Sequence, residues 1–260
     1  MRHNIQVTVV FLGTGTSHGV PMIGCECAVC RSDDPRDRRL RPSILIEHDG
    51  TRVLVDTATD LRQQCLREGV SQLDAVVYTH AHADHILGFD ELRRFNVMSQ
   101  SPMPIYADAD TLSALRRTFS YAFEPPEQVG GGIPQVTVHE ITGNFTVGSL
   151  TFEPLALFHG RRPVLGFRVG RFAYLTDCNV IPEPTMRRLD GLDVLVLDAL
   201  RHRPHPTHFS LSEAVAAAGM IGATRTFFTH MCHDLGHEAT CATLPSGMAL
   251  AHDGLRVECS

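Results

Sequence analysis

The chain has 260 residues, 43% of them hydrophobic, which is enough to bury the core of one domain spanning residues 1–260. Its formal charge of -6 argues against a nucleic-acid partner, because sequence-independent binding to phosphate backbones requires a basic face. All 23 basic residues are arginine, so Schiff-base chemistry and a Walker-type phosphate lysine are excluded.

The start of the chain, Met1 to Asn4, leads into a strand-like run and lacks the pattern of a signal peptide. No apolar stretch reaches the length of a membrane span. These features predict a soluble cytoplasmic protein without a membrane partner. In such a reducing compartment the eight cysteines are not expected to form a disulfide framework.

The first predicted strand runs from Ile5 to Leu12 and opens into a glycine-rich loop, Gly13 to Gly19. The loop is not a nucleotide-binding loop, because Pro21 and three cysteines follow it where a helix would be required. The remaining elements of the first half are a hairpin, three helices and one more strand. They are predicted at Ser43–Glu47 and Arg52–Asp56, Thr59–Glu68, Asp90–Asn96, Thr111–Tyr121, and Pro104–Ala107, before an irregular loop from Glu124 to Pro134.

Three thiols lie within six residues at Cys25, Cys27 and Cys30. Three thiolates this close form most of a tetrahedral structural zinc site and require one further Cys or His. A redox pair of Cys27 and Cys30, or three unrelated thiols, are the alternatives. Redox motifs normally open a helix in a βαβ unit, whereas this segment continues into a charged loop, so zinc is favoured.

The second half alternates strands with helices. Strands are predicted around Val136–His139, Leu150–Leu157, Gly166–Val169, Phe172–Thr176, Val194–Asp198 and Arg225–Phe228. A helix from Ser210 to Met220 begins with a capping box, in which Ser210 pairs with Glu213. Strand runs with helices outside them indicate stacked sheets in an α/β sandwich.

The stretch Thr79-His80-Ala81-His82-Ala83-Asp84-His85 follows a short apolar run and holds three imidazoles and one carboxylate within six positions. Imidazole and carboxylate suit zinc and its first-row neighbours. We expect His80 and His82 to converge on one ion. Asp84 and His85 would point to a second ion, because one tetrahedral centre cannot take all four side chains and keep a position for water.

Three further donor residues follow apolar runs in the second half, at His159, Asp177 and His230. Asp177 could bridge two ions through its two oxygens. His233 lies three residues after His230, so one loop could serve the catalytic centre and the cysteine cluster. The competing donors Cys178, Cys232 and His237 are expected to be bystanders.

The pattern His80-x-His82-x-Asp84-His85, together with His159, Asp177 and His230, resembles the metallo-β-lactamase superfamily over nearly the whole chain. This resemblance implies a four-layer αββα sandwich. Within the superfamily, the loop at Gly13-Thr14-Gly15, the cysteine segment and Thr229-His230-x-x-His233 resemble the phosphoribosyl cyclic-phosphate phosphodiesterases of bacterial phosphonate degradation.

The resemblance assigns a role to each candidate site residue. It implies one catalytic ion on His80, His82 and His159, a second on Asp84, His85 and His230, and Asp177 between them. It also implies a structural zinc held by Cys25, Cys27, Cys30 and His233, and a homodimer. His208 would act near the leaving group, a choice that the residues alone cannot make over His202 and His205.

The expected activity is hydrolysis of a small, cyclic phosphodiester, such as phosphoribosyl 1,2-cyclic phosphate, by a water activated on two zinc or manganese ions. Asp84 and His208 are the candidate catalytic residues. Arg161 and Arg162 could hold a second phosphate, although arginine pairs are more often solvated. The alternatives are a nuclease of the tRNA-maturing kind, a cyclic nucleotide phosphodiesterase and, from another class, a catalytically silent metal-binding regulatory protein.

Overall fold

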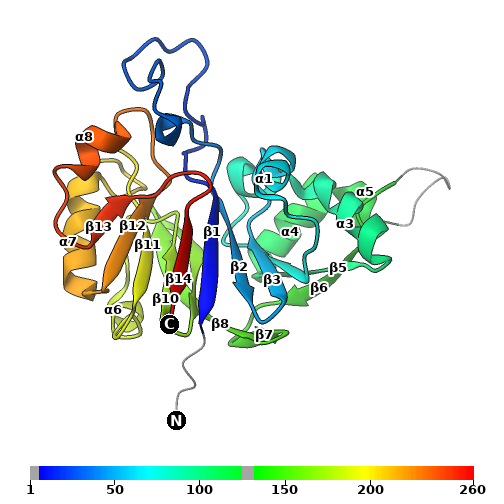
Figure 1. Cartoon of the computed structure of the whole chain (residues 1–260). Helices are drawn as coiled ribbons and strands as arrows, with labels where there is room; N and C mark the ends of the chain where they lie inside the picture. The colour runs from blue at the N-terminus through cyan, green and yellow to red at the C-terminus, as the bar shows by residue number, and fades with distance from the viewer. Residues whose placement is uncertain (1–5, 125–131) are drawn as a thin grey trace.

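The structure is a computed structural model that describes residues 6–124 and 132–260. Two seven-stranded sheets lie face to face with helices on both outer sides (Figure 1). Met1 to Ile5, which include the start of the first predicted strand, lie outside the described residues. So do residues 125–131 of the loop predicted from Glu124 to Pro134.

The first sheet has the strand order β14-β1-β2-β3-β4-β5-β6. Its strands are β1 (Val7–Gly13), β2 (Ser43–His48), β3 (Thr51–Val55), β4 (Ala75–Val77), β5 (Met103–Ala107), β6 (Val136–Glu140) and β14 (Arg256–Cys259). The hairpin predicted across His48 to Gly50 is confirmed as β2 and β3. From β3 to β6 the strands are parallel, so their carboxyl ends share one edge.

The second sheet has the strand order β13-β12-β11-β10-β9-β8-β7. Its strands are β7 (Phe145–Val147), β8 (Leu150–His159), β9 (Arg162–Val169), β10 (Phe172–Leu175), β11 (Val194–Asp198), β12 (Arg225–Thr229) and β13 (Met248–Leu250). Strands β10 to β13 are parallel to one another, whereas β8, β9 and β10 pair antiparallel. The carboxyl ends of β10, β11 and β12 therefore also meet at one edge.

Three buried apolar clusters hold the layers together. Phe11, Val55 and Val77 of the first sheet pack against Phe167 and Tyr174 of the second. One outer face is covered by α1 (Leu61–Glu68), α2 (Ala83–Ile86), η2 (Phe89–Glu91), α3 (Leu92–Ser99), α4 (Ala109–Thr118) and α5 (Ser120–Phe123). The other is covered by α6 (Glu183–Met186), α7 (Leu211–Ile221) and α8 (His237–Cys241). The predicted αββα sandwich is confirmed.

Two details of the helices test the sequence patterns. The capping box at Ser210 is confirmed, because its hydroxyl accepts from the backbone N–H of Glu213 and the Glu213 carboxylate accepts in return. The single helix predicted from Thr111 to Tyr121 is wrong. The chain leaves helical geometry at Phe119, whose ring stacks on Phe89 in the core, and α4 and α5 lie on either side of it.

The segment with the three cysteines leaves the body of the molecule after β1 and returns before β2, and it forms the projecting loop at the top of Figure 1. It contains the short helix η1 (Pro35–Asp37). Among the described residues, no helix combines the length and apolar character that crossing a membrane requires.

Candidate metal centre

The seven candidate donor side chains meet at the shared edge where strands of both sheets end. His80, His82, Asp84 and His85 follow β4 of the first sheet. His159 ends β8 of the second sheet, and Asp177 and His230 follow β10 and β12. The sandwich therefore places donors from segments up to 150 residues apart, His80 and His230, on two sides of one seam. This is the arrangement that the strand-end positions of these residues favour.

The first donor group contains His80, His82, His159 and Asp177, whose ligand-type atoms all lie within 4.8 Å of one another. The Nε2 atom of His80 lies 2.9 Å from Nδ1 of His82. His159 donates its Nδ1 proton to the carbonyl oxygen of Thr207 at 2.7 Å, so its Nε2 lone pair is left for a ligand. Three imidazoles and a carboxylate of this kind fit a first-row divalent ion.

The second donor group contains Asp84, His85, Asp177 and His230, within the same limit of 4.8 Å. The Oδ2 atom of Asp84 lies 3.4 Å from Nε2 of His230 and 3.7 Å from Nε2 of His85. All four residues are buried. Carboxylates that converge with imidazoles in a buried site need a positive charge beside them. A bound cation can supply it, or protons on the imidazoles can do so when no cation is bound.

Asp177 belongs to both groups. Its Oδ2 atom lies 3.1 Å from Nε2 of His230, 3.2 Å from Nε2 of His85 and 3.7 Å from Nε2 of His80. The other oxygen, Oδ1, accepts a hydrogen bond from the hydroxyl of Thr176 at 2.7 Å. A single oxygen of Asp177, rather than the two expected from the sequence, therefore faces both groups.

Asp56 supports the donors of the first sheet, and sequence reasoning missed it. It follows β3, is fully buried and accepts from Nδ1 of His85 at 2.8 Å. It also accepts from the hydroxyl of Thr79, which in turn lies 3.0 Å from Nδ1 of His80. A carboxylate behind a ligand imidazole fixes its tautomer and increases its basicity.

Asp198, at the end of β11, has the corresponding position in the second sheet. Its Oδ2 atom accepts from Nδ1 of His208 at 2.8 Å and from the backbone N–H of Cys178 at 2.9 Å. The ring of His208 lies 4.4 Å from that of His159 and 4.7 Å from that of His230, centroid to centroid. The structure thus brings His208 to the metal centre, with Nδ1 engaged and Nε2 available for proton transfer.

Both missed carboxylates had a sequence signal. Asp56 directly follows one apolar strand and Asp198 ends another, which is close to the pattern that singled out Asp177. His208 also belongs to a donor group with Asp177, Asp198 and His230, whose ligand-type atoms lie within 4.8 Å of one another.

The carboxylates determine which imidazoles carry protons when no metal is bound. Burial lowers the pKa of His85, but Asp177, Asp84 and Asp56 raise it well above its ordinary value. Against the same effect of burial, Asp177 raises the pKa of His230 to about 10. Burial keeps the pKa of His80 well below its ordinary range and lowers that of His82 to about 4, so both are neutral.

We expect zinc binding to the metal-free protein at neutral pH to release protons from His85 and His230, because a metal ligand must be a neutral imidazole. The raised pKa of His230 stabilises the metal-free fold fully below its unfolded pKa of 6.5, and this contribution is lost as pH rises through about 10. Metal affinity should therefore rise with pH across that window. Indicator-dye titration in weak buffer measures the release. His230→Gln should release fewer protons, and an unchanged proton count would contradict the assignment.

A separate donor group contains Cys25, Cys27, Cys30 and His233. The Nδ1 atom of His233 lies 3.1 Å, 3.4 Å and 3.6 Å from the three sulfur atoms, respectively. The backbone N–H of Cys30 lowers the pKa of Cys27 to about 7, whereas burial raises the pKa of Cys30 to about 11. The structure brings together the three sulfurs and the imidazole nitrogen named from the sequence, and a donor set of this kind suits a structural zinc ion.

Replacing Cys27 by serine should lower thermal stability, because a structural metal contributes its binding free energy to folding. Each kcal/mol lost corresponds to about 2–4 °C in Tm for a chain of this size. Melting curves and zinc content per chain measure the effect, with Cys65→Ser in α1 as the matched control. A variant that keeps its zinc and its Tm would argue against a structural site.

The other candidates lie as follows. Cys178 is buried in the core of the second sheet, and neither Cys178, Cys232 nor His237 belongs to a donor group among the described residues. Arg162 lines a recess of ≈ 470 Å³ beside His80 and His82, whereas Arg161 does not. His205 lies 5.1 Å from His208, centroid to centroid, and His202 is exposed.

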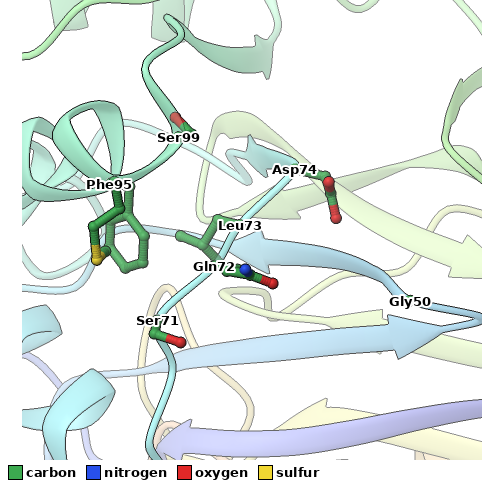
Figure 2. A pocket seen from close by; sticks show the side chains of 8 residues that line it. Gly50, Ser71, Gln72, Leu73, Asp74, Phe95 and Ser99 are labelled. Atoms are coloured by element: carbon green, nitrogen blue, oxygen red, sulfur yellow. The ribbon is translucent and has the colours of Figure 1, made fainter.

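A further pocket of ≈ 450 Å³ is shown in Figure 2, with Leu73 and Phe95 in its lining. Its residues Gly50 and Asp74 precede β3 and β4, so it lies at the opposite ends of these strands from the metal centre. Asp74 is its one acidic residue, and its carboxylate accepts from the backbone N–H of Arg52. The lining contains no imidazole or thiol, so the pocket offers no comparable donor set.

The comparisons with known proteins define the class first. Residues 51–231 match the model of the beta-lactamase superfamily domain, and the chain therefore belongs to the metallo-β-lactamase superfamily. Within it the chain is PhnP-like. A crystal structure of a diphosphatase from the PhnP family is 47% identical, with a TM-score of 0.92, and the match covers 98% of this chain and 97% of that one.

A curated relative, the octanoyltransferase of Porphyromonas gingivalis, is 38% identical over 95% of this chain. The chain spans half the length of that relative. Zinc-bound PqqB from Methylobacterium extorquens shares the fold at 20% identity and a TM-score of 0.79, over 96% of this chain and 99% of that one. Human short-form tRNase Z also shares the fold, at 19% identity and a TM-score of 0.70, over 96% of this chain and 98% of that one. At these identities the last two show the fold alone.

Proposed function

We propose that the chain is a dinuclear metal-dependent hydrolase that cleaves a phosphorus–oxygen bond in a small phosphodiester, with a cyclic phosphodiester as the first candidate. The coarser conclusion, a metal-binding hydrolase of the metallo-β-lactamase superfamily, follows from the family match and the donor groups. The observation that carries the proposal is the position of Asp177 between two donor groups, with His208 beside them.

Two divalent ions, zinc or manganese, would lower the pKa of a water and neutralise charge on a phosphoryl oxygen. The imidazoles of His80, His82 and His159 would hold one ion. Asp84, His85 and His230 would hold the other, with Asp177 shared. Asp56 keeps the Nε2 lone pair of His85 directed at the centre, because it accepts the proton of Nδ1.

His208 would supply the proton that an alkoxide leaving group needs. Asp198 accepts from its Nδ1, which orients the ring and stabilises the charged imidazole. A proton on Nε2 then faces the centre formed by His159 and His230. A protein that only bound metal would have no use for an oriented imidazole at this place.

A second candidate is cleavage of a diphosphate linkage, which the PhnP-family diphosphatase at 47% identity favours. Both reactions attack phosphorus, and both would use the same donors and the same acid. The tRNA-maturing nuclease suggested as an alternative has the support of a shared fold alone, and the net charge of -6 argues against it.

Relative kcat/KM over a substrate panel tests the proposal. Metal-reconstituted protein would be given phosphoribosyl 1,2-cyclic phosphate, a 2′,3′-cyclic nucleotide, a linear dinucleotide, a diphosphate compound and precursor tRNA. Metal-stripped protein is the control. A clear preference for a small cyclic or linear diester supports the proposal, and a preference for the diphosphate supports the second candidate. Turnover of the tRNA alone, or of nothing, would overturn both.

A further inference from the structure

A recess of ≈ 320 Å³ has His208 in its lining. Part of its lining comes from the segment that carries Leu200, Arg201, Arg203, His205 and His208. We call the rest of the lining the recess wall; it consists of Thr16, Ser17, His18, Gly19 and Met22 together with Cys232, His233 and Asp234. On the proposed function, the leaving group extends into this recess, because the acid His208 must reach the leaving oxygen.

The recess wall consists of two pieces of chain that are more than 200 residues apart in sequence, and both contact Arg39. The backbone of Arg39 pairs with Val20, with N–H···O distances of 2.7 Å and 2.9 Å. Its guanidinium donates from Nη1 to the carbonyl oxygen of Cys232 at 3.0 Å and from Nη2 to that of Leu235. One residue thus fastens the base of the cysteine loop to the turn that carries His233.

Arg39 is not a solvated surface arginine. Its relative exposure is 1%, and Nη2 also lies 3.1 Å from Oδ1 of Asp37. Burial lowers the pKa of Arg39, and Asp37 opposes this effect. The same oxygen of Asp37 accepts from the backbone N–H of His237 at 2.8 Å. A charged group is tolerated at such depth only when it is paired and hydrogen-bonded. The planar guanidinium of arginine can donate in several fixed directions at once, which the ammonium of a lysine cannot do.

The neighbouring bonds show which part of the wall depends on Arg39. Met231 is held by backbone bonds to Thr14 and Thr16, and the N–H of Cys232 donates to Leu200. The carbonyl oxygens of Cys232 and Leu235, which lie on either side of His233 in the chain, accept hydrogen bonds from the Arg39 side chain. Arg39 therefore acts on the position of His233, and through it on the approach of His233 to the three thiolates.

We infer that the recess wall sets the specificity for the leaving group and that Arg39 is the positioning residue that holds both pieces of this wall in place. Because His233 belongs both to this wall and to the donor group with Cys25, Cys27 and Cys30, that donor group would then contribute to substrate binding as well as to stability. The inference rests on the proposed function for the direction of the leaving group, but the position of the wall can be measured without any substrate.

Arg39→Lys tests the inference, with Arg36→Lys as the matched control in the same loop, where Arg36 pairs with Asp34 at the surface. For methyl p-nitrophenyl phosphate, whose leaving group needs no proton, KM should rise on the order of 10-fold, the value of a lost hydrogen bond to a charged group. The kcat should change little, because the metal donors are untouched. Zinc content should fall and the cysteines should react faster with a thiol-specific dye.

The possible outcomes distinguish a failure of the inference about Arg39 from a failure of the proposed function. An unchanged KM with a lower Tm and a smaller active fraction would make Arg39 a purely structural residue and overturn the inference. Unchanged thiol reactivity and zinc content would overturn it as well. Absence of turnover in the wild type would contradict the proposed function, while the thiol and zinc measurements still decide the role of Arg39. If Arg39→Lys does not fold, Asp37→Asn removes the counter-charge and keeps the acceptor, and the same effects should appear in weaker form.

Discussion

Turnover of a phosphodiester such as bis-p-nitrophenyl phosphate should fall by well over 100-fold when Asp84 or His85 is replaced by alanine. The loss of a residue behind a ligand already costs roughly 10–100-fold in metal affinity or activity, and the loss of the ligand itself should exceed this. Asp84 and His85 contribute two of the four donors of the second group, so the variants should bind one ion less tightly. Metal content and kcat, measured on the same preparation, check both effects.

His48→Ala is the matched control, because His48 lies at the end of β2 and donates to the backbone carbonyl of Gln6. It should keep full activity and metal content. A folded Asp84→Ala protein with wild-type turnover would falsify the assignment of two catalytic ions. Partial restoration at raised metal concentration would support it, because a weakened site refills by mass action.

His208→Ala should keep its full metal content and lose on the order of 10²–10⁴ in rate, the usual contribution of a general acid. The loss should be large for an alkyl or ribosyl leaving group and small for p-nitrophenolate, which departs without a proton. Comparing kcat/KM on one substrate of each kind measures this difference. Equal losses on both substrates would make His208 a phosphate-binding residue, and a loss of metal would make it a ligand.

Asp198→Asn provides an independent check on the acid. The amide keeps the volume but removes the charge that stabilises the protonated imidazole of His208. The loss of kcat/KM in Asp198→Asn should likewise be large for an alkyl or ribosyl leaving group and small for p-nitrophenolate. His202→Ala, in the same loop but exposed, is the control and should behave as the wild type.

Most donors of this centre can be predicted from the sequence, because their positions along the chain follow simple rules. His80 to His85 are contiguous, and His159, Asp177 and His230 each end an apolar run. Parallel strands that end at one edge then bring these residues together. The capping box at Ser210 and the hairpin at His48 to Gly50 are equally local, since the residues that define them are neighbours in the sequence.

What the sequence did not provide depends on contacts across the fold. Asp56 and Asp198 lie at strand ends, as Asp177 does, but their partners His85 and His208 are identified only when the strand order is known. The break at Phe119 follows from its packing on Phe89 rather than from helix propensity. The role of Arg39 was hidden for the same reason, because its partners lie more than 190 residues away.

The division of donors between the sheets has a consequence for folding. His80 and His85 belong to one sheet, His159 and His230 to the other, and Asp177 faces both groups. An opening of the seam would separate these donors, so metal binding should stabilise both sheets by the same free energy, about 4 kcal/mol at a thousandfold excess over Kd. Amide hydrogen exchange in β4 and in β12 should then slow together when metal is added, and the halves should lose this cooperativity when it is removed.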